Sequence, residues 1–552
     1  MDDSGAKGAS GAGGVSDTGG ASGAEGASGG WGSWEGLVSA ALLGTERRPG
    51  AGGPGGLLDE AARWTVRRRA GLVPAPAPVR PGRAPEDRRP SLPSAARRRL
   101  AQLLADRSAP AHSGGRRGAA PDLAELLPQW LSTATERGFR APSELLPALL
   151  DAARARTDLR PQALAFAGPR GLWLARLNPE WRFALRGGPG SAVLPDASDE
   201  EAVRRLWDEG LFAERVALLA AVRAHRPGAA RELLASTWTA ERAEDRLLFL
   251  DSLRDGLSDD DEPFLERALA DRSRNVRATA AELLSALPAS ALAGRMAVRA
   301  ASCVALDRSG DAEARIAVEA PHECDAGMQR DGVAPKPPTG RGERSWWLGQ
   351  LVEAAPLGSW TARLGGRSAR EIVAMPVADE WGDELHAAWC RAAVRQRDAE
   401  WSRALLGTPS APPGGNAGTI SLAERAKLLS TLREEERAEW VAAFIQAHGL
   451  SEAFQLLGVC LVPWSAGLGR AVVDALEIAR DAGSYPWSFS GVMGLAERCL
   501  NPDEAPRLEA LTAIPPEDEG ASPGSGSYWA EAFQRLVGTL RLRAAMRAEL
   551  GG

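Results

Sequence analysis

The clearest pattern in the chain is a stripe of apolar residues at helical spacing. Between residues 272 and 287 the apolar positions recur with a period of about 3.6 residues, which places them on one face of an α-helix. They are Val276, Ala280, Leu283, Leu284 and Leu287. Residues 261–271 form an amphipathic segment just before it, with Pro263 near its start, where a missing N–H is tolerated. The two segments together predict a helical hairpin.

The preceding stretch repeats this plan. Residues 226–237 and 240–253 predict another pair of helices, and Leu253 takes the position that Leu287 holds in the later pair. These two leucines are 34 residues apart, which is long enough for one helical hairpin per repeat. We therefore expect residues 199–306 to form an array of stacked hairpins, in which each hairpin buries its apolar face against the next.

Changes of composition divide the rest of the chain. Residues 1–30 are rich in Gly, Ala and Ser and are expected to be a disordered tail, whereas residues 31–198 alternate helical segments with Pro- and Gly-rich breaks. Residues 307–342 lose the helical period and predict a linker or irregular loop. Residues 343–552 predict a C-terminal helical region, in which 380–406 is expected to be one long helix. The expected fold is all-α: an α-solenoid of stacked hairpins with flanking helical regions.

Charge and composition narrow the classes of function. The formal net charge is −6 at pH 7, whereas domains whose main task is to neutralise phosphates are usually basic. The five cysteines are far apart and never spaced C-x-x-C, as expected of free thiols in a reducing compartment. No secretion signal is recognised at the start, and no apolar run reaches the roughly 18–20 residues that span a bilayer. We expect a cytoplasmic protein that contacts no membrane and for which nucleic acid is not the favoured partner.

The sequence contains no motif that indicates catalysis, a cofactor or a metal. Residues 322–325, His-Glu-Cys-Asp, are the one cluster of possible metal ligands, but zinc needs three or four converging ligands and the other histidines lie on separate segments. A Gly-x-Gly-x-x-Gly spacing that begins at Gly50 precedes no predicted strand, so it does not indicate a dinucleotide site. We therefore expect no metal, no cofactor and no catalytic residue. The sequence leaves open whether an unrecognised pocket supports an enzyme activity.

Two groups of residues are candidate contacts for a partner. Tryptophans gather near the start of the C-terminal region, and tryptophan is enriched at the energetic centres of protein interfaces. The candidates are Trp346, Trp347, Trp360 and Trp381. Arginines concentrate between residues 63 and 117, a segment suited to nucleic acid or an acidic partner, and one run comprises Arg67, Arg68 and Arg69. The alternative for both groups is structural, as interhelical packing for the tryptophans and a solvated helix face for the arginines.

The stretch that begins at Asp271 resembles the core of a HEAT repeat. In those repeats an aspartate opens the second helix after the turn and a Val-Arg pair enters it, as Asp271 and the pair Val276-Arg277 do here. The resemblance implies that residues 199–306 are HEAT-like repeats.

Further motifs resemble an uncharacterised actinobacterial and cyanobacterial family of unknown function. They are Leu37-Val38 with Ala41 to Arg47, Trp173-Leu174 with Asn178-Pro179 and Trp181, Asp261 to Glu266, and Leu287-Pro288 with Leu292 and Arg295-Met296. The resemblance spans residues 31 to about 360 and supplies no catalytic residue. Genes of that family lie near those of a MoxR-type ATPase, a von Willebrand A-type protein and a SWIM-type zinc-finger protein. The resemblance therefore implies a role in a bacterial multiprotein system.

The sequence leaves two main functions open. The first is a non-catalytic protein–protein interaction scaffold, since stacked hairpins create an extended binding surface. The partners that the resemblance implies for it are a MoxR-type ATPase or a von Willebrand A-type protein. The alternative is a HEAT-like protein that binds nucleic acid through the Arg-rich segment 63–117.

Overall fold

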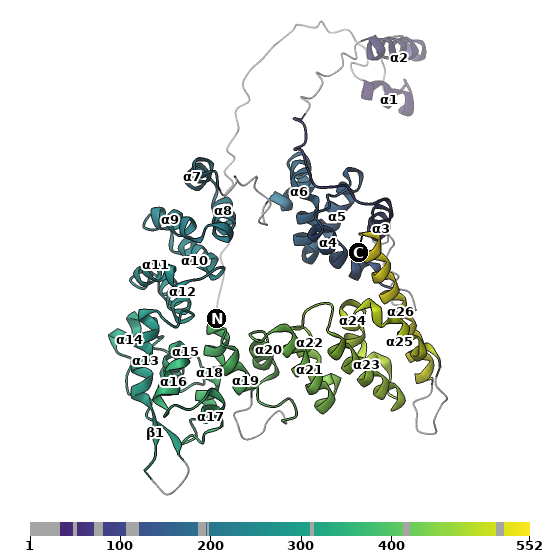
Figure 1. Ribbon diagram of the computed structural model, residues 1–552. Helices are drawn as coiled ribbons and strands as arrows, with labels where there is room; N and C mark the ends of the chain where they lie inside the picture. Colours follow the sequence, from purple (N-terminus) through teal and green to yellow (C-terminus); the bar gives the residue numbers. More distant parts are fainter. Residues whose placement is uncertain are drawn as a thin grey trace, which may run out of the picture. The chain divides into compact units, whose positions relative to one another are not determined.

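A computed structural model describes residues 34–47, 52–70, 81–105, 121–185, 195, 198–309, 314–411, 420–514 and 524–551 of the 552-residue chain. These residues are mostly helical and include one two-stranded hairpin (Figure 1). The predicted helical class is thus confirmed, while the predicted tail, residues 1–30, lies outside the described part of the chain. By their contacts the described residues divide into two units, one up to Arg83 and one from Ala84 onward.

The described residues of the first unit form two helices, α1 (Trp34–Leu43) and α2 (Gly53–Ala70). Among these residues Leu37 and Ala40 are buried, and they pack against Leu57 and Trp64 of α2. The last turn of α2 carries Arg67, Arg68 and Arg69, where basic side chains interact favourably with the negative end of the helix dipole.

The second unit begins with a block of four helices. They are α3 (Ser94–Ala105), α4 (Leu123–Glu136), α5 (Leu146–Ala155) and α6 (Arg160–Leu177). Leu100, Leu127 and Phe166 lie in its core, fully shielded from solvent. Helix α6 is kinked at Gly168, whose φ of 58° suits glycine and precedes Pro169.

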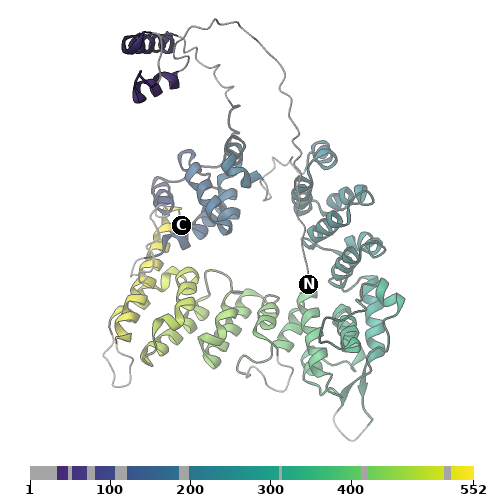
Figure 2. The same ribbon diagram turned by 180° about the vertical axis from the view of Figure 1, so that it is seen from behind.

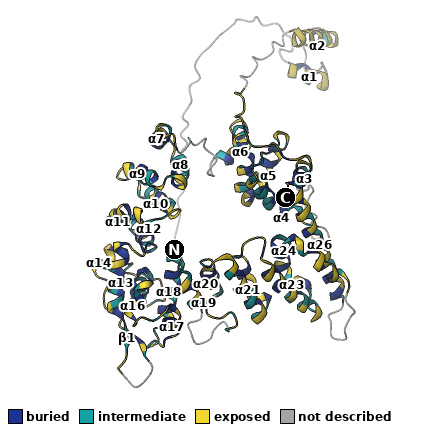
Figure 3. Ribbon diagram, viewed as in Figure 1, coloured by how far each residue is buried: buried dark blue, intermediate teal, exposed yellow. Residues whose placement is uncertain are grey.

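The middle of this unit is a succession of helix pairs. Its helices are α7 (Glu200–Glu209), α8 (Phe212–His225), α9 (Pro227–Thr237), α10 (Ala243–Asp251), α11 (Glu262–Ala268), α12 (Arg274–Ser285) and α13 (Ala291–Cys303). The predicted hairpin corresponds to α11 and α12, which pack against each other, and α12 also contacts α10 before it and α13 after it. Every residue of the predicted stripe on α12 is buried. Buried positions face neighbouring helices throughout this region, and exposed positions face outward (Figure 3).

Ion pairs connect successive helix pairs. Asp261 is fully buried and accepts hydrogen bonds from Arg223 at 2.6 Å and Arg231 at 2.9 Å. Arg246 on α10 pairs with Asp271 at 2.8 Å, in the turn between α11 and α12. The aspartate that carries the HEAT-like motif therefore holds one pair of helices to the next.

The segment predicted to be a linker contains regular structure. Strand β1 (Val304–Asp307) pairs antiparallel with β2 (Arg315–Val318), with Val304 opposite Val318. Each strand has four residues, which is too short for the alternation of period two to stand out in the sequence. Helix α14 (Ala326–Arg330) follows, and the buried Asp331 after it pairs with Arg295 and Arg299 of α13 at 2.9 and 2.7 Å.

The remaining helices continue to the C-terminus. They are α15 (Glu343–Ala354), α16 (Gly358–Arg363), α17 (Ala369–Ala374), α18 (Gly382–Gln396), α19 (Ala399–Leu406), α20 (Leu422–Leu429), α21 (Glu434–His448), α22 (Leu450–Leu457), α23 (Ala466–Asp481), α24 (Ser490–Cys499), α25 (Ala505–Leu508) and α26 (Ser525–Glu549). Short 3-10 helices join several of these elements. They are η2 (Ser143–Leu145), η3 (Thr157–Leu159), η4 (Pro179–Leu185), η5 (Ser252–Arg254), η6 (Asp259–Asp261), η7 (Pro486–Phe489), η8 (Pro502–Glu504) and η9 (Glu509–Thr512).

The prediction of one helix over residues 380–406 is wrong. Helix α18 ends at Gln396, and Arg397 adopts the left-handed conformation with φ 52° and ψ 40°. Asp398 then caps α19, because its side chain accepts a hydrogen bond from the Trp401 backbone N–H at 3.0 Å. The apolar period runs through both helices and hides the break.

Helix α26 joins the two ends of the second unit. Its first half lies in the core that contains α23 and α24, whereas Met546 and Leu550 lie in the core of the α3–α6 block. Glu549 accepts hydrogen bonds from Arg99 of α3 at 2.6 and 3.1 Å. Both views of the chain show the end of α26 beside α3 and α4 (Figures 1 and 2). Among the described helices, none combines the length and the apolar character needed to cross a membrane.

Candidate functional site

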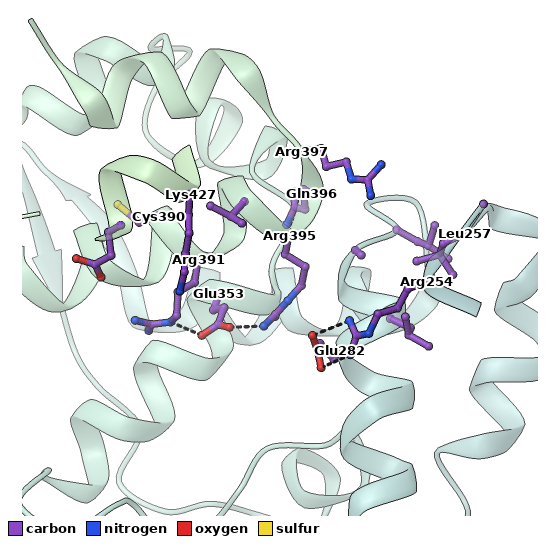
Figure 4. A pocket seen from close by; sticks show the side chains of 16 residues that line it. Arg254, Leu257, Glu282, Glu353, Cys390, Arg391, Arg395, Gln396, Arg397 and Lys427 are labelled. Atoms are coloured by element: carbon purple, nitrogen blue, oxygen red, sulfur yellow. Dashed lines mark hydrogen bonds and ion pairs between the residues drawn. The ribbon is translucent and has the colours of Figure 1, made fainter. Parts of the chain in front are cut away.

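A groove with a volume of about 760 Å³ lies where the helix pairs of the array meet α15, α18 and α20 (Figure 4). One wall comes from η5, the loop after it and α12, and the other comes from α15, α18 and α20. Its size lies within the roughly 300–1,000 Å³ of pockets that hold small molecules or peptide side chains. We take this groove as the candidate functional site.

Apolar side chains line part of the groove. Leu283 and Leu287 come from α12 and its end, Leu257 from the loop after η5, and Val394 from α18. Leu283 and Leu287 belong to the stripe that predicted α12, so the edge of the array core opens into the groove. The groove therefore offers an apolar surface beside its charged groups.

A bidentate ion pair lies on the wall of the groove that η5 and α12 form. Arg254 donates hydrogen bonds to both carboxylate oxygens of Glu282, at 2.9 and 3.0 Å, and to Asp251 at 2.6 Å. The hydrogen bonds from Arg254 hold the pKa of Glu282 below its ordinary value. Arg254 and Glu282 thus neutralise each other.

A second ion-paired group lies on the α18 side. Arg391 and Arg395 both donate to the carboxylate of Glu353 on α15, Arg391 over 2.6 Å. Arg395 lies between Glu353 and Glu282 in Figure 4, and its charge also lowers the pKa of Glu282. The groove floor is therefore a network of alternating charges.

Two cations at the groove remain uncompensated. Arg397 and Lys427 are exposed, and the cationic group of neither makes a hydrogen bond or ion pair with any described residue. The carboxylate of Glu424, which also lines the groove, caps its own helix by accepting from the backbone and side chain of Ser421. The left-handed backbone at Arg397 costs about 1–2 kcal/mol for a residue with a Cβ atom.

The chemistry of the groove is that of an anion-binding surface. Five cationic side chains face three carboxylates there, so the lining carries an excess of positive charge. Cys390 also lines the groove, and burial raises the pKa of its thiol to about 12, which keeps it protonated at neutral pH and unreactive as a nucleophile. The arrangement is suited to binding negatively charged groups beside apolar ones.

The four tryptophans that were predicted to contact a partner differ in how far they are buried. Trp360 is buried against Trp389, with ring centroids 6.0 Å apart, and Trp347 is buried while its indole N–H donates to the Pro335 carbonyl at 2.9 Å. Trp346 and Trp381 are partly exposed. Trp347 and Trp360 therefore belong to the core, and a role in partner binding stays a prediction for all four.

Trp346 lies on the same face of α15 as the groove residue Glu353. The two residues are seven positions apart, or two helical turns and about 10 Å along the axis. Arg341 lies over the Trp346 ring at 5.3 Å and pairs with Glu384 of α18, next to Gly349. The charged surface of the groove thus continues along α15 to Trp346.

The predicted arginine segment falls into both units. Arg67, Arg68 and Arg69 are exposed in the first unit, where Arg68 lies 5.7 Å from the Trp34 ring centre. Three arginines of the segment that belong to the second unit form ion pairs. The pairs are Arg89 with Asp87, Arg97 with Glu144, and Arg99 with Glu549. Residues 71–80 and 106–117 of the segment, which include Arg116 and Arg117, lie outside the described residues.

The possible metal ligands at residues 322–325 do not converge. His322 is exposed, and Asp325 caps α14 by accepting from the Met328 backbone N–H at 2.7 Å. Within the described ranges, no group of three or more His, Cys, Asp and Glu side chains is placed to hold a metal ion. Gly50, where the glycine spacing begins, lies outside those ranges.

The sequence does not reveal the groove because its residues come from five separate stretches of the chain. No periodicity or motif links Arg254, Glu353 and Arg395, which meet only through tertiary packing. Two weak signals are present in the sequence. Lys427 is one of only three lysines in a chain rich in arginine, and Asp398 has the residue type and position of a helix cap.

Comparison with known proteins identifies a family and no characterised relative. No curated protein and no solved structure matches the chain. The sequence matches a family of unknown function (DUF5691) over residues 36–550. Because this match covers nearly the whole chain, the protein belongs to the DUF5691 family.

Proposed function

We propose that the protein is a HEAT-like helical-repeat scaffold of a bacterial multiprotein system, and that it binds a protein partner at the groove between α12, α15, α18 and α20. The observation that carries this proposal is the groove itself. Uncompensated cations and an apolar patch lie side by side there, on a surface assembled from rigid helices. Such a combination gives specificity through charge and affinity through apolar burial.

The packing order supports a repeat architecture. From α7 to α24 the principal contacts join helices that are one to three places apart along the chain, and one continuous core connects Val203 with Leu540. Contact restricted to neighbouring hairpins is typical of solenoid proteins, whose extended surfaces commonly bind other proteins. The ion pair of Asp271 with Arg246 extends the HEAT-like motif into a contact between hairpins.

A protein partner is better supported than nucleic acid. Nucleic-acid binding needs many free cations, whereas the groove neutralises Arg254, Arg391 and Arg395 internally. The alternative site, segment 63–117, likewise has four of its described arginines in ion pairs. Arg67, Arg68 and Arg69 are its exposed run, and they are the residues through which nucleic-acid binding is tested.

The test is pairwise binding of the full chain to two proteins from the same host, a MoxR-type ATPase and a von Willebrand A-type protein. Biolayer interferometry at about 150 mM salt is expected to give saturable binding to at least one of them. Leu257→Glu, which places a carboxylate on the apolar patch, is expected to weaken binding about tenfold or more. Leu211→Glu changes an exposed leucine outside the groove and is the matched control.

Two kinds of result would contradict the proposal. One is a failure of the binding assay, in which neither protein binds or both leucine variants bind as the unmodified chain does. The other is sub-micromolar binding of duplex DNA or RNA at the same salt concentration, lost when Arg67, Arg68 and Arg69 are changed to Glu. The second result establishes the nucleic-acid alternative, because contacts to phosphates lose affinity steeply as salt rises.

A further inference from the structure

We infer that the groove binds an acidic segment of the partner, in which carboxylates flank an apolar side chain. Arg397 and Lys427 are the two residues that bind these carboxylates. The inference rests on the proposed function, since it specifies what the partner presents to the groove. It depends on three observations: the charge balance of the lining, the backbone of Arg397, and the origin of the two cations, which no described residue pairs with, on different helices.

The excess of positive charge in the groove lining favours an anionic ligand. Glu282 and Glu353 are already bound by arginines, and Glu424 caps its own helix. None of the three carboxylates forms an ion pair with Arg397 or Lys427 among the described residues, and the lining keeps an excess of two positive charges. An incoming carboxylate satisfies these cations without breaking an existing pair.

The backbone of Arg397 indicates that its side chain is needed. The residue ends α18 in the left-handed conformation, a position that glycine or asparagine occupies with less strain. An arginine there places a long cationic side chain at the groove edge at the expense of stability. Strain of this kind is characteristic of functional positions.

The placement of the two cations favours an extended ligand over a single small anion. In Figure 4 Lys427 and Arg397 lie apart, with Arg395 between them in this view. The two cations come from different helices, Arg397 from the end of α18 and Lys427 from the last turn of α20, so two anionic groups match them better than one. Two acidic residues of one segment supply these groups, and an apolar residue between them matches the apolar side chains of Leu257, Leu287 and Val394.

The inference is tested with a fluorescein-labelled peptide of sequence Glu-Glu-Leu-Glu-Glu, blocked at both ends, titrated with the full chain at about 50 mM salt. Fluorescence anisotropy is expected to show saturable binding with a dissociation constant of roughly 10–100 μM. A matched peptide with every Glu replaced by Gln is expected to bind about tenfold more weakly or not at all. Inorganic phosphate and duplex DNA are the competitors.

Two variants separate recognition from folding. Arg397→Gly is expected to weaken peptide binding about tenfold while melting at the same temperature as the unmodified chain or higher, because glycine relieves the left-handed strain. Lys427→Gln is expected to weaken binding similarly without a change in melting. Arg370→Ala and Lys336→Gln, at exposed positions outside the groove, are the matched controls and should bind normally.

The inference is overturned if the Gln peptide binds as well as the Glu peptide, or if neither peptide binds. It is also overturned if Arg397→Gly and Lys427→Gln bind like the controls, or if millimolar inorganic phosphate displaces the peptide completely, which would identify a small-anion site. The peptide assay contains no partner protein. Failure of the inference is therefore distinguishable from failure of the proposed function, which is decided by the pairwise binding of whole proteins.

Discussion

At the scale of single residues, a few buried side chains determine the stability of the helix array. Leu284 is fully buried between α12 and its neighbours. We expect Leu284→Asp to destabilise the array by more than about 4 kcal/mol, because it leaves a cavity and buries a carboxylate without a partner. Loss of helical circular dichroism and of hydrogen-exchange protection over residues 200–303 measures the effect.

The matched control for this change is Val298→Asp. Val298 lies on α13 and is 73% exposed, so the same charge is added where water solvates it. Its expected effect is within about 0.5 kcal/mol. Equal exchange rates in the Leu284 and Val298 variants would show that α12 does not pack as described.

Buried carboxylates make the stability depend on pH. Burial raises the pKa of Asp331, but hydrogen bonds from Arg295 and Arg299 outweigh it and place the folded pKa below the ordinary value of 3.8. A lowered folded pKa stabilises the fold above the unfolded pKa, and this contribution is lost as the pH falls through the folded value. We expect the urea midpoint to fall between pH 7 and pH 3.

The contribution of Asp331 to this pH dependence is isolated by substitution. Asp331→Asn removes the titrating group and is expected to lower the midpoint at pH 7 and to flatten its fall toward pH 3. Asp208→Asn, at an exposed position, is the control and should leave the profile unchanged. A profile for Asp331→Asn as steep as that of the unmodified chain would assign the acid sensitivity to other groups.

At the scale of elements, the break between α18 and α19 shapes the groove. Asp398 caps α19, and removal of such a cap costs about 1 kcal/mol. Asp398→Ala should therefore speed hydrogen exchange of the α19 amides about fivefold, while Asp398→Asn, which retains a capping oxygen, should change it little. Similar exchange in both variants would mean that packing alone ends the helix.

The helices were largely predictable from sequence, whereas their interruptions were not. Apolar stripes such as that of α12 repeat over several turns, so the period of 3.6 residues stands out. The β1–β2 hairpin offers four residues per strand and no comparable pattern. The break at Arg397 leaves the apolar period intact. The one sequence signal that marks this break is the capping residue Asp398.

At the scale of the whole molecule, α26 connects the α3–α6 block to the rest of its unit. Arg99 and Glu549 form a two-pronged, partly buried pair across this contact. Glu549→Arg should loosen the block and speed hydrogen exchange in α3, while adding Arg99→Glu should restore protection, with a coupling of about 1 kcal/mol. Absence of rescue in the double variant would show that the pair does not form in solution.

The candidate site forms only when helices from distant parts of the chain pack together, and for that reason the sequence does not reveal it. Glu282 and Glu353 are ordinary helix-surface positions in their own segments, and they become neighbours only when α12, α15 and α18 pack together. The tryptophans were conspicuous by residue type, yet Trp347 and Trp360 are buried because large aromatic side chains fill interhelical space. Residue type alone does not separate core from interface.

If a protein partner occupies the groove between α12, α15, α18 and α20, its binding must shield the backbone amides of the groove. Hydrogen–deuterium exchange of the full chain, with and without a saturating MoxR-type ATPase or von Willebrand A-type protein, measures this shielding. We expect slower exchange on binding in the stretches around residues 282–287, 390–397 and 424–427. Protection confined to residues 63–70, or no protection at the groove with either protein bound, would show that the partner does not occupy the groove.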